Sequence, residues 1–302
     1  MRMLRTTRFV LPLLLLTVTA PAEDKGPSDL LKLPVSTGAR RIPYGPDPLQ
    51  FGELRVPPGK GPHPVVTIVH GGCWVTKLKQ LDEHAVALDL VRPIAEALAE
   101  IGIATWNLEY RRLGNTGGGW PGTFEDVARG TDHLRKIAGE NGLDLTRVVA
   151  MGHSSGGHLA LWLAARKKLA PSSELYSKDP LTLKGVIDLD GPWDMRAMLP
   201  VQERICGAPV ITQLLGGTPE EFPQRYRDAS PNELLPLGVR QEIFAGAMFG
   251  AQAPAYETAA TRAGDAVHTL VSAKAGHFVF IDPGSPMWTE VVKSTRALLG
   301  IQ

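Results

Sequence analysis

The fold is decided by the stretch Arg147-Val-Val-Ala-Met151, Gly152-His153-Ser154-Ser155-Gly156, in which an apolar run leads into a G-x-S-x-G motif. Apolar residues then recur at helical spacing, which places the motif at a strand-to-helix turn. Such a turn strains its central residue and leaves room only for very small side chains two positions away. Gly152 and Gly156 meet that requirement, so we expect the Ser154 hydroxyl to stand clear of the carboxyl edge of a sheet, where α/β proteins bind ligands. A Gly/Ser-rich turn without chemistry is the alternative.

Short apolar runs alternate with helix-like segments along the rest of the chain. Strands are predicted at 40–44, 49–56, 65–69, 103–108, 148–152, 186–189, 242–245 and 267–271. Helices are predicted at 84–100, 123–138, 155–169, 255–263 and 287–299. The runs are dense in Val, Ile and Leu, as is typical of strands buried on both faces. This alternation predicts an α/β fold with a mainly parallel central sheet and helices on both faces. The first two strands have no helix between them, which predicts an antiparallel start.

Residues 1–22 have the composition of a secretory signal. Three arginines, ending at Arg8, precede the apolar run 9–18, and Ala20-Pro21-Ala22 is a small-residue cleavage pattern. The apolar run is about half of the roughly 20 residues that a membrane-spanning helix needs. We therefore expect cleavage after Ala22, export to the periplasm or beyond, and no stable membrane insertion, with a permanent anchor as the alternative. The remainder, 23–302, is expected to be one domain.

The segment from about 191 to 238 differs from the rest of this domain. It is rich in Pro and Gly and carries only short helical patches. Connections of this length are either functional or disordered. A lid or cap over the site and a plain surface connection are therefore both open interpretations.

Charge and motif content argue against several function classes. The net charge is +1, and loss of the three signal arginines would make it about −2. The sequence has no basic run with interleaved aromatic residues, so no nucleic-acid partner is expected. It also has no His-Glu-x-x-His, no phosphate loop, no strand-led G-x-G-x-x-G and no closely spaced Cys or His ligand set. No metal or organic cofactor is expected.

A second motif, His70-Gly71-Gly72-Cys73-Trp74, follows the predicted strand 65–69. A Gly-rich turn exposes backbone N–H groups, which can hold the negative charge that acyl transfer builds on a carbonyl oxygen. We expect Gly72 and Cys73 to supply two such donors, and Ser155, at a helix N-terminus, to supply a third. Alone the motif is equally consistent with a simple tight turn. Together with the serine motif it indicates an oxyanion hole.

Three stretches carry a resemblance to a known family. They are His70 to Trp74, then Glu109-Tyr-Arg-Arg112 through Trp120-Pro-Gly-Thr-Phe124, and Gly152-His-Ser-Ser-Gly-Gly-His158. In this order the chain resembles the α/β-hydrolase superfamily, in the branch of small carboxylesterases related to acetyl esterases, feruloyl esterases and kynurenine formamidase. The resemblance implies a serine hydrolase that cleaves small acyl or aryl esters through an acyl-serine intermediate. A formamidase or peptidase would use the same machinery, and a catalytically impaired, hydrolase-like binding protein is the alternative from another class.

The resemblance also implies a catalytic histidine in the loop after the last strand. His277 follows the predicted strand 267–271 and is expected to act as base for Ser154. Structural interpretations suit the other seven histidines: motif geometry for His70 and His153, a helix position for His158, and surface or satisfied core positions for His63, His84, His133 and His268.

The family has a third catalytic residue, an acid that orients the histidine, and its position in this sequence departs from the family pattern. The family places an Asp in the turn after the strand 242–245, but the stretch 245–254 contains no acidic residue. Asp190 follows the strand 186–189 and would emerge at the neighbouring strand's carboxyl end, as in a related lipase branch. We predict its carboxylate within about 3.2 Å of a His277 ring nitrogen. A turn-forming Asp, a Ser–His dyad and lost catalysis are the alternatives. Weaker candidates for the acid are Asp188, Asp194, Glu242 and Asp265.

Cys73 and Cys206 are the two cysteines of the chain. An exported protein meets an oxidising compartment, and no thiol chemistry explains these residues, so a disulfide between them is predicted. It would tie the turn after the strand 65–69 to the segment after the sixth strand. Two buried free thiols remain the alternative, because two cysteines provide no spacing pattern.

Overall fold

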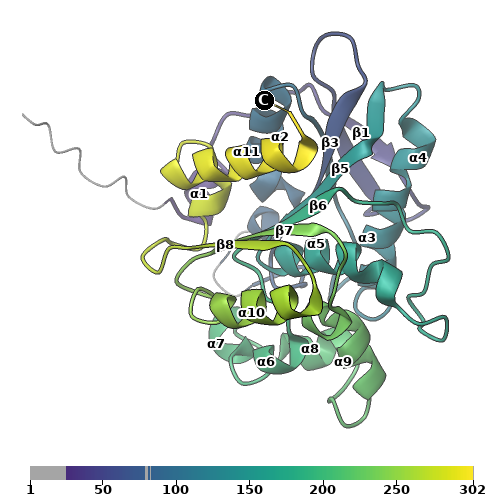
Figure 1. Ribbon diagram of the computed structural model, residues 1–302, viewed down its shortest axis with the longest axis vertical. Coiled ribbons are helices and arrows are strands. Elements are labelled where there is room, and N and C mark those ends of the chain that lie inside the picture. The colour runs from purple at the N-terminus through teal and green to yellow at the C-terminus, as the bar shows by residue number, and fades with distance from the viewer. Residues whose placement is uncertain (1–24, 79–80, 82, 302) are drawn as a thin grey trace, which may run out of the picture.

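A computed structural model describes residues 25–78, 81 and 83–301, so the predicted signal at 1–22 lies outside the described residues. Its centre is an eight-stranded sheet in the order β1-β2-β4-β3-β5-β6-β7-β8 (Figure 1). The strands are β1 (Arg40–Pro43), β2 (Phe51–Arg55), β3 (His63–Val69), β4 (Ala104–Leu108), β5 (Leu143–His153), β6 (Gly185–Leu189), β7 (Arg240–Ala245) and β8 (Val267–Val271). The β1–β2 and β2–β4 pairs are antiparallel and the other pairs are parallel. The predicted fold class and its antiparallel start are confirmed, and each predicted strand overlaps an observed one.

Helices cover the sheet on two sides. The longer ones are α2 (Arg92–Glu100), α3 (Gly122–Asp132), α5 (Ser155–Ala165), α10 (Ala253–Ala263) and α11 (Pro286–Leu299), and shorter ones include α1 (Pro27–Leu30) and α4 (Leu134–Ile137). In Figure 1, α2 and α11 lie on one side of the sheet and α3, α5 and α10 on the other. In the described part of the chain, no helix combines the length and apolar character needed to cross a membrane.

The two helical layers follow from the alternation of side chains along each strand. Val66 and Ile68 of β3 belong to a buried cluster with Leu98 of α2. Val65 and Val69, which point to the opposite face, belong to a second cluster with Leu159 of α5. Because successive strand residues point to opposite faces, a run in which every residue is apolar must be covered on both sides.

One predicted helix starts later than expected. The sequence predicts a helix over 84–100, but two 3₁₀ turns, Glu83–Val86 and Leu88–Val91, come first and α2 begins at Arg92. Pro93 explains the difference. Its ring would clash with the carbonyl four residues earlier in a continuous helix, whereas proline is well accommodated in a first helical turn.

The segment 191–238 contains short helices that pack beside α10 (Figure 1). They are α6 (Met195–Met198), α7 (Gln202–Cys206), α8 (Val210–Leu215), α9 (Pro223–Ala229) and the 3₁₀ turn η4 (Pro231–Leu234). Buried side chains, including Ile211, Leu214 and Tyr226, join it to the same core cluster as α5. We refer to residues 191–238 as the cap segment.

Candidate active site

Ser154 occupies a sharp turn between β5 and α5. Its backbone has φ 56° and ψ −125°, a conformation that residues with side chains rarely adopt. A Cβ added at Gly152 would overlap the carbonyl of Gly156, and one added at Gly156 would overlap the carbonyl of Val69. The observed backbone therefore has the strained central residue and the small flanking residues that the serine motif requires.

His277 and Asp190 are in contact, although 87 residues separate them. The Asp190 Oδ2 atom lies 2.7 Å from Nδ1 of His277, within the distance expected from the sequence. Asp190 emerges directly after β6 and is buried, and His277 lies in the loop after β8. With Nδ1–H donating to the carboxylate, Nε2 of His277 is left as the nitrogen that can take a proton.

The turn after β7 contains no acidic residue. Its backbone instead donates hydrogen bonds to the Asp190 carboxylate. The backbone N–H groups of Gly246 and Phe249 donate to Oδ1 of Asp190 at 2.8 and 3.4 Å. The backbone of Asp190 has φ 54°. A non-glycine residue in this region persists only where its surroundings hold it. These two donors and the His277 ring orient both carboxylate oxygens.

The other candidate carboxylates have different partners. Asp194 caps α6 through the N–H groups of Arg196 and Ala197, and Asp265 accepts from Leu237, Gly238 and Gln241. Glu242 pairs with Arg240 and His268. Asp188 accepts from the N–H of Gly191 at 2.9 Å, and burial, followed by the nearby Asp190, raises its pKa well above the ordinary value. Asp190 is thus the member of this set that contacts His277.

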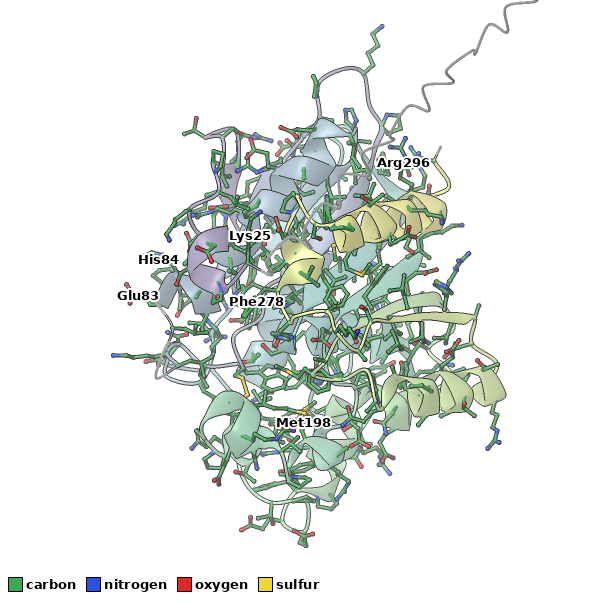
Figure 2. The ribbon with its side chains drawn as sticks, turned by 90° about the vertical axis from the view of Figure 1, so that its left-hand side faces the viewer. Lys25, Glu83, His84, Met198, Phe278 and Arg296 are labelled. Carbon is green, nitrogen blue, oxygen red and sulfur yellow. A yellow bond between two sulfur atoms is a disulfide. The ribbon has the colours of Figure 1, made fainter. Side chains whose placement is uncertain are left out.

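Ser154 and His277 line the same pocket, of about 260 Å³. Both are described residues, and no hydrogen bond joins the Ser154 hydroxyl to the His277 ring in this state. Catalytic hydrogen bonds are often long before substrate binds and tighten in the complex. The other lining residues are mostly apolar: Pro27, Gly72, Cys73, Leu78, Leu81, Ala85, Leu90, His153, Ile205, Met248 and Phe278. Figure 2 shows Phe278, the neighbour of His277, above Met198 of the cap segment in that view.

His153 supports the histidine loop, a role that the sequence did not predict. Its Nε2–H donates to the backbone carbonyl of His277 at 2.9 Å, and the two rings are 4.5 Å apart. Burial, and then the nearby His277 ring, hold the pKa of His153 well below its ordinary value. A neutral ring with its proton on Nε2 fits this contact, because the buried Nδ1 has no partner among the described residues. His153 thus links the turn that carries Ser154 to the loop that carries His277.

The oxyanion turn, residues 70–74, presents unused backbone donors beside Ser154. Gly72 and Cys73 have φ 109° and 54°, and no hydrogen bond within the described residues uses their N–H groups. Ser155 is the first residue of α5, where a backbone N–H has no partner within the helix. A Cβ at Gly71 would lie 2.8 Å from the His153 carbonyl and 3.0 Å from the Ser154 Cβ, so glycine permits this close approach.

A buried charged cluster lies beneath this turn. His70 contacts the Gly71 carbonyl through Nδ1 at 2.8 Å and a Glu109 carboxylate oxygen through Nε2 at 3.1 Å. Burial would raise the pKa of Glu109, but His70 and Arg112 lower it below its ordinary value. The Tyr110 hydroxyl donates to the His70 carbonyl at 2.8 Å. The stretch 109–112, which marked the family resemblance, therefore supports the turn.

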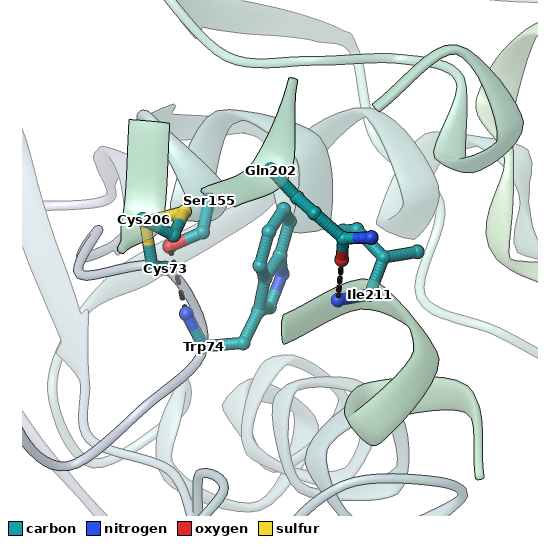
Figure 3. The surroundings of a disulfide bond; sticks show 6 residues. All are labelled: Cys73, Trp74, Ser155, Gln202, Cys206 and Ile211. Carbon is teal, nitrogen blue, oxygen red and sulfur yellow. Dashed lines mark hydrogen bonds between the residues drawn. A yellow bond between two sulfur atoms is a disulfide. The ribbon is translucent and has the colours of Figure 1, made fainter. Parts of the chain in front are cut away.

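Cys73 and Cys206 form a disulfide, which Figure 3 shows. Their Cα atoms are 5.9 Å apart. The bond connects the oxyanion turn with the last residue of α7, so the predicted pairing is present. In the described part of the chain, no group of three or more His, Cys, Asp or Glu side chains is placed to hold a metal ion.

Comparisons with known proteins identify the family and agree with the fold. The family model described as BD-FAE matches residues 54–236. The fold is similar to esterase B from Lactobacillus rhamnosis, with a TM-score of 0.71, 20% identity and 88% of each chain covered. It is also similar to the esterase Est2 from Thermogutta terrifontis solved with butyrate bound, with a TM-score of 0.67, 19% identity, and 87% of this chain and 94% of that one covered.

A curated relative matches part of the chain. It is the probable isoprenylcysteine alpha-carbonyl methylesterase ICMEL1 from Arabidopsis thaliana, 27% identical over 136 residues. The match covers 45% of this chain and 26% of the relative. The matched region thus spans about a quarter of the relative's length.

Proposed function

The chain belongs to the BD-FAE family, and from this premise we propose that it is a serine carboxylesterase with Ser154 as nucleophile, His277 as base and Asp190 as the acid that orients the base. The observation that carries the proposal is His277, which contacts Asp190 through Nδ1 and lines the same pocket as Ser154. A carboxylate in this position keeps the ring in one tautomer and stabilises its cation.

The reaction proceeds in two halves. His277 Nε2 removes the Ser154 proton as the hydroxyl oxygen attacks the ester carbonyl, and the charge on the former carbonyl oxygen is held by the N–H groups of Gly72, Cys73 and Ser155. The bond to the alcohol then breaks, and the proton on His277 passes to the leaving oxygen. Water, deprotonated by His277, attacks the acyl-serine and releases the acid and Ser154.

The pocket supports a small, uncharged substrate. Leu78, Ile205, Met248 and Phe278 are among its lining side chains, and among the described residues that line it only the two histidines are ionisable. Apolar walls favour apolar acyl groups and disfavour charged ones, which would lose hydration without a partner. Esterase B of Lactobacillus rhamnosis was solved with a tributyrin phosphonate and Est2 with butyrate. We therefore expect short acyl groups of about this size to be accepted.

The place of action is proposed to be outside the cytoplasm. The composition of residues 1–22 favours export with cleavage after Ala22. The Cys73–Cys206 disulfide supports the same proposal, because such bonds persist in oxidising compartments.

Nitrophenyl esters of rising acyl length test the function. We expect the highest kcat/KM for acetate or butyrate and a decline towards octanoate. Ser154→Ala should lower kcat by at least about 10⁴-fold while its circular dichroism spectrum stays unchanged. Undiminished turnover in that variant would refute the proposal, and activity on the matching anilides but not on the esters would point to an amide hydrolase.

A further inference from the structure

The oxyanion turn adopts a backbone conformation that its own sequence does not favour. Cys73 and Trp74 both have positive φ, 54° and 57°, although neither is a glycine. Two adjacent side-chain-bearing residues in this region persist only where contacts from outside the turn hold them. The donors assigned to Gly72 and Cys73 therefore depend on those contacts.

The first contact is covalent. The disulfide joins Cys73 to Cys206, the last residue of α7 in the cap segment, and both side chains are buried (Figure 3). One residue of the turn thus cannot move without α7.

The second contact is a pair of hydrogen bonds from Trp74. Its backbone N–H donates to the Ser155 hydroxyl at 3.4 Å (Figure 3), and its indole N–H donates to Nδ1 of His158 at 3.2 Å. Burial lowers the pKa of His158 to about 4, so the ring is neutral and Nδ1 is free to accept. The other ring nitrogen, Nε2, donates to the carbonyl of Ala229 in the cap segment at 2.7 Å. His158 thus connects the turn and the cap segment through one side chain of α5.

The cap segment is itself fixed to the body of the protein. The indole N–H of Trp162, on α5, donates to the Asp228 carbonyl at 2.9 Å. The backbone N–H of Trp120 donates to the Leu214 carbonyl at 2.7 Å. Met195, Leu214 and other buried residues of the segment lie in the main core cluster. A segment anchored in this way can hold another part of the chain in place.

We propose that the cap segment positions the oxyanion turn, with Cys206 and His158 as positioning residues that keep the Gly72 and Cys73 donors in register with Ser155. The cap segment is then a fixed brace, in contrast to a lid that opens and closes. This inference rests on the proposed function, because it concerns the alignment of donors that act in acyl transfer.

The brace has a kinetic signature. Oxyanion donors bind the charge that develops in the transition state more strongly than the neutral carbonyl of the substrate. Loosening them should therefore lower kcat and leave KM nearly unchanged. A general loss of folded protein would instead lower the apparent enzyme concentration and would not change affinity for a transition-state analogue per folded molecule.

The test compares Cys206→Ser with Gln202→Met. Gln202 lies in the same helix, and its side-chain oxygen accepts from the N–H of Ile211 at 2.7 Å (Figure 3). Its replacement removes a hydrogen bond within the cap segment but leaves the disulfide and the His158 contacts with the turn intact. For each variant, kcat and KM on nitrophenyl butyrate and the affinity of an aryl boronic acid, which forms a tetrahedral adduct with serine, are measured. The fraction of folded protein is measured by near-ultraviolet circular dichroism.

Cys206→Ser should lose about ten- to a hundredfold in kcat, less than the roughly 10²- to 10³-fold loss that follows removal of a whole oxyanion donor. Its KM should stay within twofold and its boronate affinity should fall with kcat. Gln202→Met should keep kcat within twofold. Equal losses in both variants, or wild-type kcat and boronate affinity in Cys206→Ser, would overturn the brace.

A second variant covers the case in which Cys206→Ser does not fold. His158→Leu keeps the disulfide and removes the acceptor of the Trp74 indole, and it should show the same fall in kcat at nearly constant KM. Wild-type kcat in folded His158→Leu would overturn the brace. A wild-type protein with no esterase activity would instead refute the proposed function, so the two failures are distinguishable.

Discussion

Asp190 is a residue whose two carboxylate oxygens face different parts of the chain. One oxygen accepts from the backbone after β7 and the other contacts His277 after β8. The proposed acid thus directly follows β6, while the turn that carries the acid in the family pattern supplies N–H donors. Moving the carboxylate by one strand preserves its contact with the base because parallel strands end at the same edge of a sheet.

Asp190→Asn should lower kcat by about 10²- to 10⁴-fold with little change in stability. The amide cannot stabilise the His277 cation and can favour the wrong tautomer, a change that costs about 10⁴-fold in serine proteases. Asp194→Asn is the matched control, because asparagine also caps helices well and Asp194 caps α6. Steady-state kinetics on one ester measures both. Near-wild-type kcat in Asp190→Asn would favour a Ser–His dyad.

His158 makes stability depend on pH. The ordinary pKa of this ring is 6.5, and burial lowers it to about 4 in the folded protein. Between these values the unfolded chain binds more protons than the native one, so stability is full above about pH 6.5 and is lost as the pH falls towards 4. The difference corresponds to roughly 3 kcal/mol.

Urea unfolding at pH 7 and pH 4.5 measures this dependence. His158→Leu should be less stable at pH 7 but should lose less on acidification than the wild type, since the titrating ring is gone. The buried His153 ring, whose pKa is also lowered, contributes in the same direction in both proteins. An identical pH dependence in the two proteins would argue against a neutral, buried His158.

At the scale of elements, the oxyanion turn and the turn that carries Ser154 are packed against each other. Gly71→Ala should lower kcat by at least tenfold, because its Cβ would lie 2.8 Å from the His153 carbonyl and push the turn away from Ser154. Gly139→Ala is the control, since a Cβ there meets nothing within 4 Å. Equal kcat in the two variants would show that the approach of the turns does not matter.

The strands and most helices could be predicted from the sequence because their signal is local. Apolar runs such as Val148 to Met151 specify a buried strand without reference to their partners. The start of α2 could not be located by apolar periodicity, because one proline at position 93 decided it. The side-chain contacts around the site are harder to predict than the ends of helices. His153 meets His277 across 124 residues, and sequence spacing contains no information about such a pair.

The place of Asp190 could be predicted in part from the sequence. Its position after a predicted strand was a local signal, and its partner followed from the expected strand order. His70 and Glu109 could have been paired by the same reasoning, because β3 and β4 are neighbours and each residue directly follows its strand. In the sequence, the stretch 109–112 indicates only the family resemblance. The brace from the cap segment required the tertiary structure, because short helices in a Pro- and Gly-rich segment provide weak periodicity.

At the scale of the whole molecule, the disulfide joins residues 133 positions apart. Cross-links that close loops of this size typically contribute 2 to 4 kcal/mol, with up to about 5 in the chain-entropy treatment. Thiol titration in denaturant should find no reactive thiol without reductant and two with it, in protein recovered from an exporting host. Two reactive thiols without reductant would refute the bridge and weaken the argument for export.

The central claim is that Ser154 is an activated nucleophile, and labelling with a fluorophosphonate tests it most directly, since an activated serine reacts and an inert one does not. Intact mass spectrometry after brief exposure should show one added phosphonyl group, and peptide mapping should place it on Ser154. Ser154→Ala should remain unlabelled and Asp190→Asn should label more slowly. A wild-type protein that stays unlabelled while folded, or that carries the adduct on another residue, would contradict the account.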